Sequence, residues 1–162
     1  MNKIYLKIGD VAISTGPAIM ETILGSCVSI CLWDETTKLA GMNHYMLPDL
    51  MDDIEQPERF GPGSIKRLLS EIKVAECDSG HLKAKIFGGG NVVRELSSGF
   101  EIGKKNVELA REMMLEHNIP VISEYTGNEC GIKVVFHSET GRVFVRKLEI
   151  ECSKSLRCEQ CL

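Results

Sequence analysis

Residues 24–48 constrain the fold most, because two apolar runs are joined there by a short polar segment. In the first run, residues 26–33, apolar side chains alternate with cysteine and serine, as a half-buried strand requires. The second run, residues 39–47, is rich in methionine, tyrosine and leucine, and residues 34–38 between the runs are polar and turn-forming. The simplest local structure is an antiparallel hairpin.

This hairpin predicts that a cysteine thiol and a histidine imidazole lie close together. If Asp34 pairs with Thr37 across the turn, Cys27 lies directly opposite His44. Opposed residues on one face have Cβ atoms roughly 4.5–5.5 Å apart, which is compatible with a hydrogen bond from sulfur to imidazole. The turn lacks the Asn-Gly or Asp-Gly signal of a two-residue loop, and an odd-length loop would offset the pair by one residue. The alternative role for Cys27 is that of a small core residue.

Five sequence blocks follow one another between residues 24 and 148: LGSCVSICLWD, GMNHYMLP, KIFGGGNV, IGKKNVE and FHSETGRVFVRKL. Together they resemble the CheD family of chemoreceptor glutamine deamidases. The resemblance implies a cytoplasmic chemotaxis enzyme that converts particular glutamine side chains of chemoreceptors to glutamate. It also implies a cysteine nucleophile and a histidine base, and these roles fall on Cys27 and His44.

The resemblance further implies a threonine upstream of the nucleophile as a third active-site residue. Thr22 is the threonine in reach, although some family members carry theirs one position earlier, where this chain has Glu21. An ordinary strand threonine is the alternative role for Thr22. The fold that the resemblance implies is α+β, a cysteine-hydrolase-like single domain with mixed sheets sandwiched between helices in α/β/β/α layers.

These residue types suit hydrolysis of a carboxamide. A thiolate can attack the carbonyl carbon and expel ammonia before water releases the acid, and His44 can serve both steps as a proton carrier. The oxyanion that forms needs hydrogen-bond donors. Backbone N–H groups around Gly25 and Ser26 are the expected source, since glycine lets the backbone approach closely.

Composition limits the function classes. The chain has 162 residues with 43% hydrophobic content, so we expect one domain over residues 1–150 and a cysteine-containing polar tail over residues 151–162. A formal net charge of −4 without a basic stripe gives no support to nucleic-acid binding. No segment reaches the ~20 apolar residues of a membrane span, so we expect no membrane insertion and a cytoplasmic protein.

Seven cysteines form an odd set without a secretion signal, which predicts reduced thiols. Three of them, Cys152, Cys158 and Cys161, gather in the tail, where a metal site lacks a second Cys-x-x-Cys or a nearby histidine. We therefore expect a solvated, poorly ordered tail and neither a metal nor a cofactor. Cys31 shares the face of Cys27, and a passive thiol is the favoured role there.

The rest of the chain predicts alternating helices and strands. Ser64 is the expected N-cap of a helix whose apolar stripe runs from Ile65 to Ile72. Glycines 88–90 lack the spacing of a phosphate loop and favour an unusual turn. His137, Ser138 and Glu139 belong to a hairpin turn rather than a catalytic triad. The remaining predictions are an irregular loop bordering a substrate groove at residues 49–62, a helix at 103–118, and strands at 82–87, 121–125, 132–137 and 142–147.

Two classes of function remain open. The first is the deamidase, with glutamines on the helical cytoplasmic domains of chemoreceptors as substrate. The second is a regulatory binding partner of a CheC-type response-regulator phosphatase, a role that needs no thiol. A general cysteine amidase or protease is a third possibility. Replacement of Cys27 by alanine separates the first two classes, because it removes catalysis and leaves partner binding intact.

Overall fold

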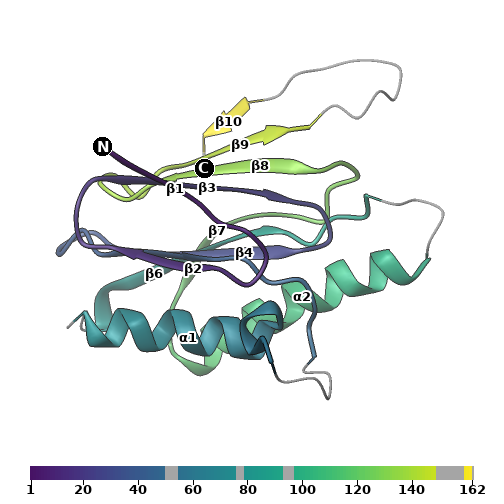
Figure 1. Ribbon diagram of the computed structural model, residues 1–162, viewed down its shortest axis with the longest axis horizontal. Coiled ribbons are helices and arrows are strands. Elements are labelled where there is room, and N and C mark those ends of the chain that lie inside the picture. Colours follow the sequence, from purple (N-terminus) through teal and green to yellow (C-terminus); the bar gives the residue numbers. More distant parts are fainter. Residues whose placement is uncertain (50–54, 76–78, 93–96, 149–158, 162) are drawn as a thin grey trace.

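The computed structural model describes residues 1–49, 55–75, 79–92, 97–148 and 159–161. These residues form two five-stranded sheets and two α-helices (Figure 1). The helices are α1 (Gly61–Val74) and α2 (Ser97–Glu116), and short 3₁₀ turns cover Pro57–Arg59 and Ser79–His81. The strands are β1 (Asn2–Tyr5), β2 (Val11–Ser14), β3 (Ala18–Leu24), β4 (Val28–Asp34), β5 (Ala40–Asn43), β6 (Leu82–Gly88), β7 (Val121–Thr126), β8 (Ile132–His137), β9 (Val143–Lys147) and β10 (Glu159–Cys161).

Both sheets are mixed. The first, called sheet A, has the order β1-β3-β8-β9-β10, and the second, sheet B, has the order β2-β5-β4-β6-β7. Each contains one parallel pair at an edge, β1 with β3 and β6 with β7, and its other neighbours are antiparallel. The chain passes from sheet A to sheet B between β3 and β4, so residues 25–27 link the two sheets.

The core has two compartments. One lies between the sheets, where Met20 and Phe136 of sheet A pack with Met42 and Phe87 of sheet B. The other lies between sheet B and the helices, and residues such as Ile30 of β4 belong to it. Alternate side chains of β4 therefore enter different compartments, which explains why the strand is buried almost throughout.

The layer order differs from the expected one. In the described residues α1 and α2 both cover sheet B, and sheet A faces outward without a helix over it, giving α/β/β (Figure 1). Consistent with an open face, Ile23 and Phe144 on sheet A are 44% and 41% exposed. The α+β class and the single domain agree with the structure, while the second helical layer of the α/β/β/α prediction is absent from the described residues.

The predicted hairpin is present as β4 and β5, but its register was wrong by two residues. Trp33 pairs with Ala40, and the backbone of Asp34 bonds with that of Leu39 rather than Thr37. The turn is longer because the Asp34 carboxylate accepts N–H groups within it and Lys38 takes a left-handed conformation with φ 61°. Lysine is uncommon at positive φ, so composition gave no sign of this turn.

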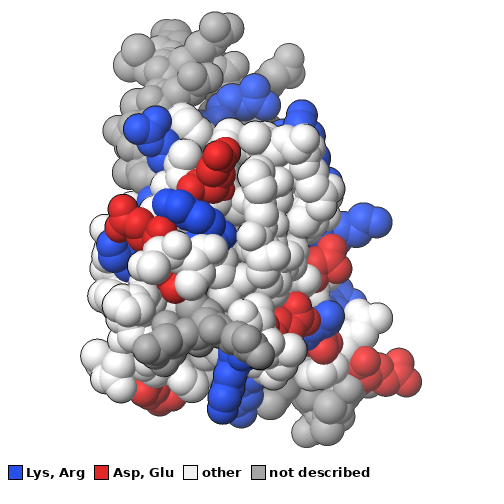
Figure 2. Space-filling view, turned by 90° about the vertical axis from the view of Figure 1, so that its left-hand side faces the viewer, with Lys and Arg blue, Asp and Glu red and all other residues white. Residues whose placement is uncertain are grey.

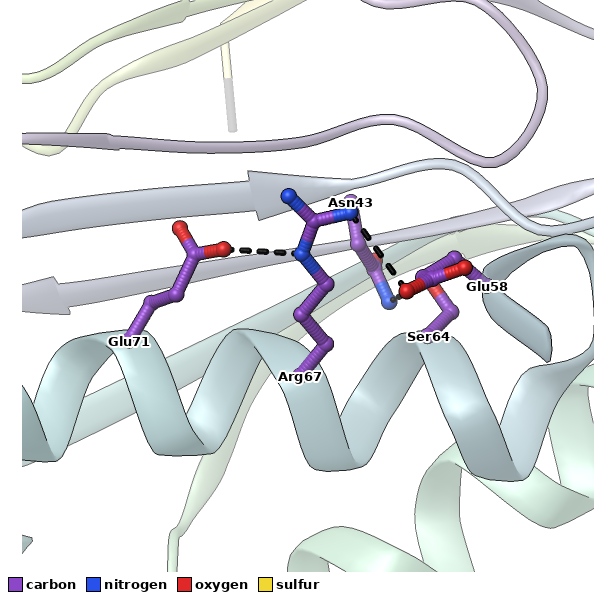
Figure 3. Close-up of polar contacts among 5 residues, drawn as sticks. All are labelled: Asn43, Glu58, Ser64, Arg67 and Glu71. Atoms are coloured by element: carbon purple, nitrogen blue, oxygen red, sulfur yellow. Dashed lines mark hydrogen bonds and ion pairs between the residues drawn. The ribbon is translucent and has the colours of Figure 1, made fainter. Parts of the chain in front are cut away.

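Helix α1 begins earlier than predicted. Its N-cap is Phe60, and Ser64 lies inside the helix, fully buried, where its hydroxyl accepts a hydrogen bond from Asn43 Nδ2 at 3.0 Å (Figure 3). On the exposed side of the same helix, Arg67 lies between two carboxylates, Glu58 and Glu71. The Asn43–Ser64 contact ties the strand that precedes His44 to the helix.

Most other predicted elements are confirmed with small changes of boundary. Strands β6 to β9 match their predictions, α2 starts before residue 103, and Gly88 and Gly89 have positive φ as an unusual turn requires. Residues 138–140 form the predicted turn, and Ser138 supports it by accepting from Ala18 N–H and donating to Gly16 O.

The tail prediction was wrong in one part, because residues 159–161 pair with β9 as β10. The pairing adds an edge strand to sheet A through backbone hydrogen bonds. Cys152 and Cys158 lie outside the described residues, as do residues 50–54 of the predicted groove loop.

The described helices include none that is long and apolar enough to cross a membrane. On the side of the molecule shown in Figure 2, basic and acidic side chains are interspersed. Neither sign forms a continuous stripe there.

Candidate active site

Thr22 and His44 meet between the two sheets. Thr22 comes from β3 of sheet A, His44 directly follows β5 of sheet B, and Thr22 Oγ1 lies 2.8 Å from His44 Nδ1. Both residues are buried, with exposed fractions of 0% and 4%. The contact joins elements that are 22 residues apart in the chain and belong to different sheets.

The hydrogen bonds around Thr22 determine which nitrogen of His44 carries the proton. The Thr22 hydroxyl has one hydrogen, and it donates to the backbone oxygen of Leu6 at 2.7 Å. Towards His44 the hydroxyl can therefore only accept, so Nδ1 of the neutral ring is protonated and Nε2 holds the lone pair. Among the described residues Nε2 has no hydrogen-bond partner, although it is buried. The ring is thus oriented as a base with its accepting atom unoccupied.

Cys27 lies at the same end of sheet B as His44, but not directly opposite it. An isolated bridge pairs Val28 with Tyr45, and this register sets His44 across from Ser29. Cys27 is then a diagonal neighbour of His44 on the same face, and such residues lie about 7–8 Å apart, with their Cβ atoms somewhat closer and within reach of long side chains. The half-buried Cys27 side chain packs against the compartment between the sheets, and the Thr22–His44 contact also joins the two sheets.

Burial shifts both members of the pair towards their neutral forms. Burial raises the pKa of the Cys27 thiol above its ordinary value, and the backbone N–H of Cys27 opposes part of this shift. Burial also lowers the pKa of His44, against smaller opposing effects of the Leu6 backbone and the Asp10 carboxylate. At neutral pH the resting site therefore holds a thiol and a neutral imidazole rather than an ion pair.

Residues 25–27, here called the nucleophile loop, are held by their carbonyl groups. In chain order, the three carbonyl oxygens accept hydrogen bonds from Gly90 N–H at 2.8 Å, Asn106 Nδ2 at 3.0 Å and Gly89 N–H at 2.8 Å. By contrast, the described residues supply no oxygen acceptor for the three N–H groups of the loop. The loop, which includes Gly25 and Ser26, is thus held in place through its carbonyls.

Sequence reasoning missed Asn106, which is fully buried and contacts the nucleophile loop. The signal was present, because the residue lies within the IGKKNVE block, and an asparagine beside the apolar stripe of a helix is unusual for a buried face. Gly89 and Gly90 were interpreted as a turn, which is confirmed, but their N–H groups also bond to the loop.

Cys31 takes no part in the contacts of Thr22, His44 and the nucleophile loop described above. Cys31 is buried, and burial raises the pKa of its thiol strongly, which agrees with the passive role favoured for it. The described residues contain no group of three or more histidine, cysteine, aspartate or glutamate side chains arranged to hold a metal. The donor set at the site is instead one thiol, one imidazole and one hydroxyl.

Comparisons with known proteins agree with the sequence blocks. A family model described as CheD, chemotactic sensory transduction, matches residues 46–147. A probable chemoreceptor glutamine deamidase CheD 1 of Anaeromyxobacter dehalogenans is 36% identical, covering 90% of this chain and 85% of that protein. The chemoreceptor glutamine deamidase CheD of Thermotoga maritima is 34% identical, covering 90% and 92%.

A solved structure is similar in fold alone. The crystal structure of the hypothetical protein YfiH of Bacillus licheniformis aligns with a TM-score of 0.50 at 12% identity. The alignment covers 74% of this chain and 51% of the YfiH chain, so this chain spans about half the length of that protein.

Proposed function

This chain belongs to the CheD family, and on that premise we propose that it is a chemoreceptor glutamine deamidase with Cys27 as nucleophile and His44 as base. The reaction converts a glutamine side chain to glutamate and releases ammonia. The observation that carries the assignment of roles is the Thr22–His44 contact, since it directs the proton-accepting nitrogen of His44 away from Thr22 and leaves it unoccupied.

The first chemical step forms a thioester. The Cys27 thiol gives its proton to His44 Nε2 as the sulfur attacks the carboxamide carbon, and the tetrahedral intermediate carries a negative oxygen. The C–N bond then breaks, and the imidazolium returns its proton to the departing nitrogen, which leaves as ammonia. Because the resting pair is neutral, proton transfer accompanies the attack instead of preceding it.

The second step releases the acid. A water molecule gives a proton to His44 as its oxygen attacks the thioester carbon, the C–S bond breaks, and the sulfur recovers the proton from His44. Thr22 keeps the ring in one tautomer during both steps and accepts from Nδ1–H whether the ring is neutral or charged. The cycle consumes one water and yields glutamate and ammonia.

The nucleophile loop supplies the oxyanion donors in this mechanism. Its carbonyls are drawn towards Gly89, Gly90 and Asn106, and its N–H groups have no oxygen acceptor among the described residues. Donors that are fixed in place before the reaction lower the barrier more than donors that must reorient, and one such donor is worth about 10²–10³ in kcat. The N–H groups of Ser26 and Cys27 are the best placed by sequence, next to the nucleophile.

The substrate in this proposal is the cytoplasmic domain of a chemoreceptor, and the reaction takes place in the cytoplasm. Binding of a CheC-type phosphatase stays a prediction from the family resemblance, since no contact or surface described above favours it. A general cysteine amidase or protease also stays an alternative, since no contact described above favours it over the receptor deamidase.

The test is mass spectrometry of a receptor cytoplasmic fragment incubated with the reduced protein, with each glutamine scored for conversion. Cys27→Ala and His44→Ala should both lose conversion, while Cys31→Ala, which removes a buried thiol of the same strand face, should retain it. No conversion by the intact protein on a cognate receptor would refute the proposal. Equal loss in Cys31→Ala would show that the effect of Cys27→Ala is not specific to the Cys27 thiol.

A further inference from the structure

Asn106 joins the two segments that carry the catalytic pair. Its Nδ2 atom donates to the carbonyl oxygen of Ser26 at 3.0 Å and to that of Met46 at 2.9 Å. Ser26 directly precedes Cys27, and Met46 lies two residues after His44. Both acceptors are backbone oxygens that cannot donate, so the orientation of the amide group is fixed by its surroundings.

The helix that carries Asn106 is itself held against the site. The Tyr45 hydroxyl donates to the backbone oxygen of Asn106, and Tyr45 is fully buried. Gly103, one turn earlier on α2, packs so closely that an added Cβ would lie 2.6 Å from the carbonyl oxygen of Gly89. Gly89 N–H bonds in turn to the carbonyl oxygen of Cys27, so this close packing leaves α2 little freedom to slide relative to the nucleophile loop.

Asn106 lowers the folding stability in a way that a purely structural role does not explain. Asn106 is 0% exposed, and among the described residues its Oδ1 atom has no hydrogen-bond donor. A buried polar atom without a partner costs about 1–3 kcal/mol. Residues that break a local rule of stability in this way concentrate where function requires them.

We propose that Asn106 is a positioning residue of the deamidation, which sets the distance between Cys27 and His44 by holding Ser26 O and Met46 O with one amide group. The inference rests on the proposed function. Asn106 does not touch the receptor, because its side chain is fully buried. Its loss should therefore lower kcat and leave KM unchanged, and a misplacement of about 1 Å between reacting groups costs on the order of 10²-fold.

The experiment compares Asn106→Ala with a matched control, Ser138→Ala. Ser138 is also fully buried and also holds two backbone groups of another segment, Ala18 N–H and Gly16 O, but at a turn outside the site. Receptor deamidation is measured as kcat and KM per folded molecule, with the folded fraction taken from circular dichroism. We expect Asn106→Ala to lose about 10²-fold in kcat with KM within twofold, and Ser138→Ala to keep both constants.

A receptor-independent readout separates this inference from the proposed function. Peptide-resolved alkylation of Cys27 by iodoacetamide at neutral pH reports how well His44 assists the thiol, and Asn106→Ala should react as slowly as His44→Ala. If the wild-type protein deamidates no receptor glutamine, the proposed function fails while the alkylation comparison still decides the role of Asn106.

Three results would overturn the positioning role. The first is a kcat per folded molecule within threefold of wild type, and the second is a rise in KM without a fall in kcat. The third is wild-type alkylation of Cys27 in the variant. If Asn106→Ala does not fold at assay temperature, Asn106→Ser is measured at 10 °C by the same criteria, and failure of both to fold assigns the residue to folding instead.

Discussion

The loops at the two ends of β4 are held in opposite ways. The turn after β4, residues 35–38, is satisfied from within, since the Asp34 carboxylate accepts from Thr36 N–H at 2.7 Å and the Thr37 hydroxyl accepts from Leu39 N–H. The nucleophile loop before β4 is held from outside, because its carbonyls accept from Gly89 N–H, Gly90 N–H and Asn106 of α2. A loop fixed from outside can leave its N–H groups unoccupied, and a substrate can use them.

The largest effect should come from disturbing the contacts through which other segments hold the nucleophile loop. A Cβ added to Gly88 would overlap the Cys27 carbonyl oxygen, so Gly88→Ala must move the nucleophile loop. We expect receptor deamidation to fall by about 10²-fold or more in kcat. The control variant is Gly127→Ala, where φ is also positive, 72° against 100° for Gly88, but nothing lies within 4 Å of the added Cβ. It also places a side chain at positive φ, so equal losses in the two variants would contradict the role of the Cys27 contact.

Thr22→Val should have the next largest effect, because it removes the acceptor of His44 Nδ1–H and keeps the shape of the side chain. We expect kcat to fall by roughly 10- to 100-fold, less than the ~10⁴-fold loss that follows removal of a charged orienting residue in serine proteases. The valine also leaves Leu6 O and Nδ1–H unpaired, at a cost of about 1–3 kcal/mol in stability. Thr22→Ser should restore most of the activity in the same assay, and a serine variant as poor as valine would contradict the hydroxyl's role.

The pH dependence tests the neutral pair. Burial lowers the pKa of His44 below its usual value of about 6.5, so kcat/KM should rise with pH through a midpoint below 6.5 as His44 loses its proton. The unfolded chain binds a proton at His44 more readily than the folded one, so the free energy of unfolding should fall as pH drops below 6.5. Rate profiles and denaturant titrations of wild type and His44→Asn measure both. An acid limb centred above 6.5 would indicate an ion pair.

The smallest effect on activity should come from a change in the turn at residues 35–38, whose hydrogen bonds are made within the turn itself. Asp34→Ala removes the acceptor of Thr36 and Thr37 N–H, which should cost about 1–2 kcal/mol in stability. Deamidation should stay within twofold of wild type, because the turn lies at the far end of β4 from Cys27. Chemical denaturation and the receptor assay measure the two quantities. A large loss of activity would show that the ends of β4 are coupled.

The fold was predictable where the signal was local. Alternating runs gave β4, and helical spacing gave α1 and α2, because each pattern reports which face of one element is buried. The hairpin register was not predictable, since it depends on a lysine at positive φ and a carboxylate that holds the turn. Ser64 shows the same limit: its residue type favours a cap, but a tertiary contact with Asn43 places it inside the helix.

The site was predictable only in part, for a related reason. Cys27 directly precedes β4 and His44 directly follows β5 of the same hairpin, so spacing placed them at the same end of it even with the wrong register. Thr22 belongs to the other sheet, and only the family resemblance pointed to it before the structure joined it to His44. Asn106 was missed, because nothing in helical periodicity shows that a polar residue beside the buried stripe reaches a loop 80 residues earlier.

The Thr22–His44 hydrogen bond joins sheet A to sheet B, so the catalytic rate should depend on the distance between the two sheets. Two of the side chains that fill the gap, Met20 and Met42, are flexible and tolerate substitution better than branched residues. Exchanging them for bulkier or smaller residues should widen or narrow the sandwich by fractions of an ångström. Turnover would then respond to distortions of the core that leave the overall fold unchanged.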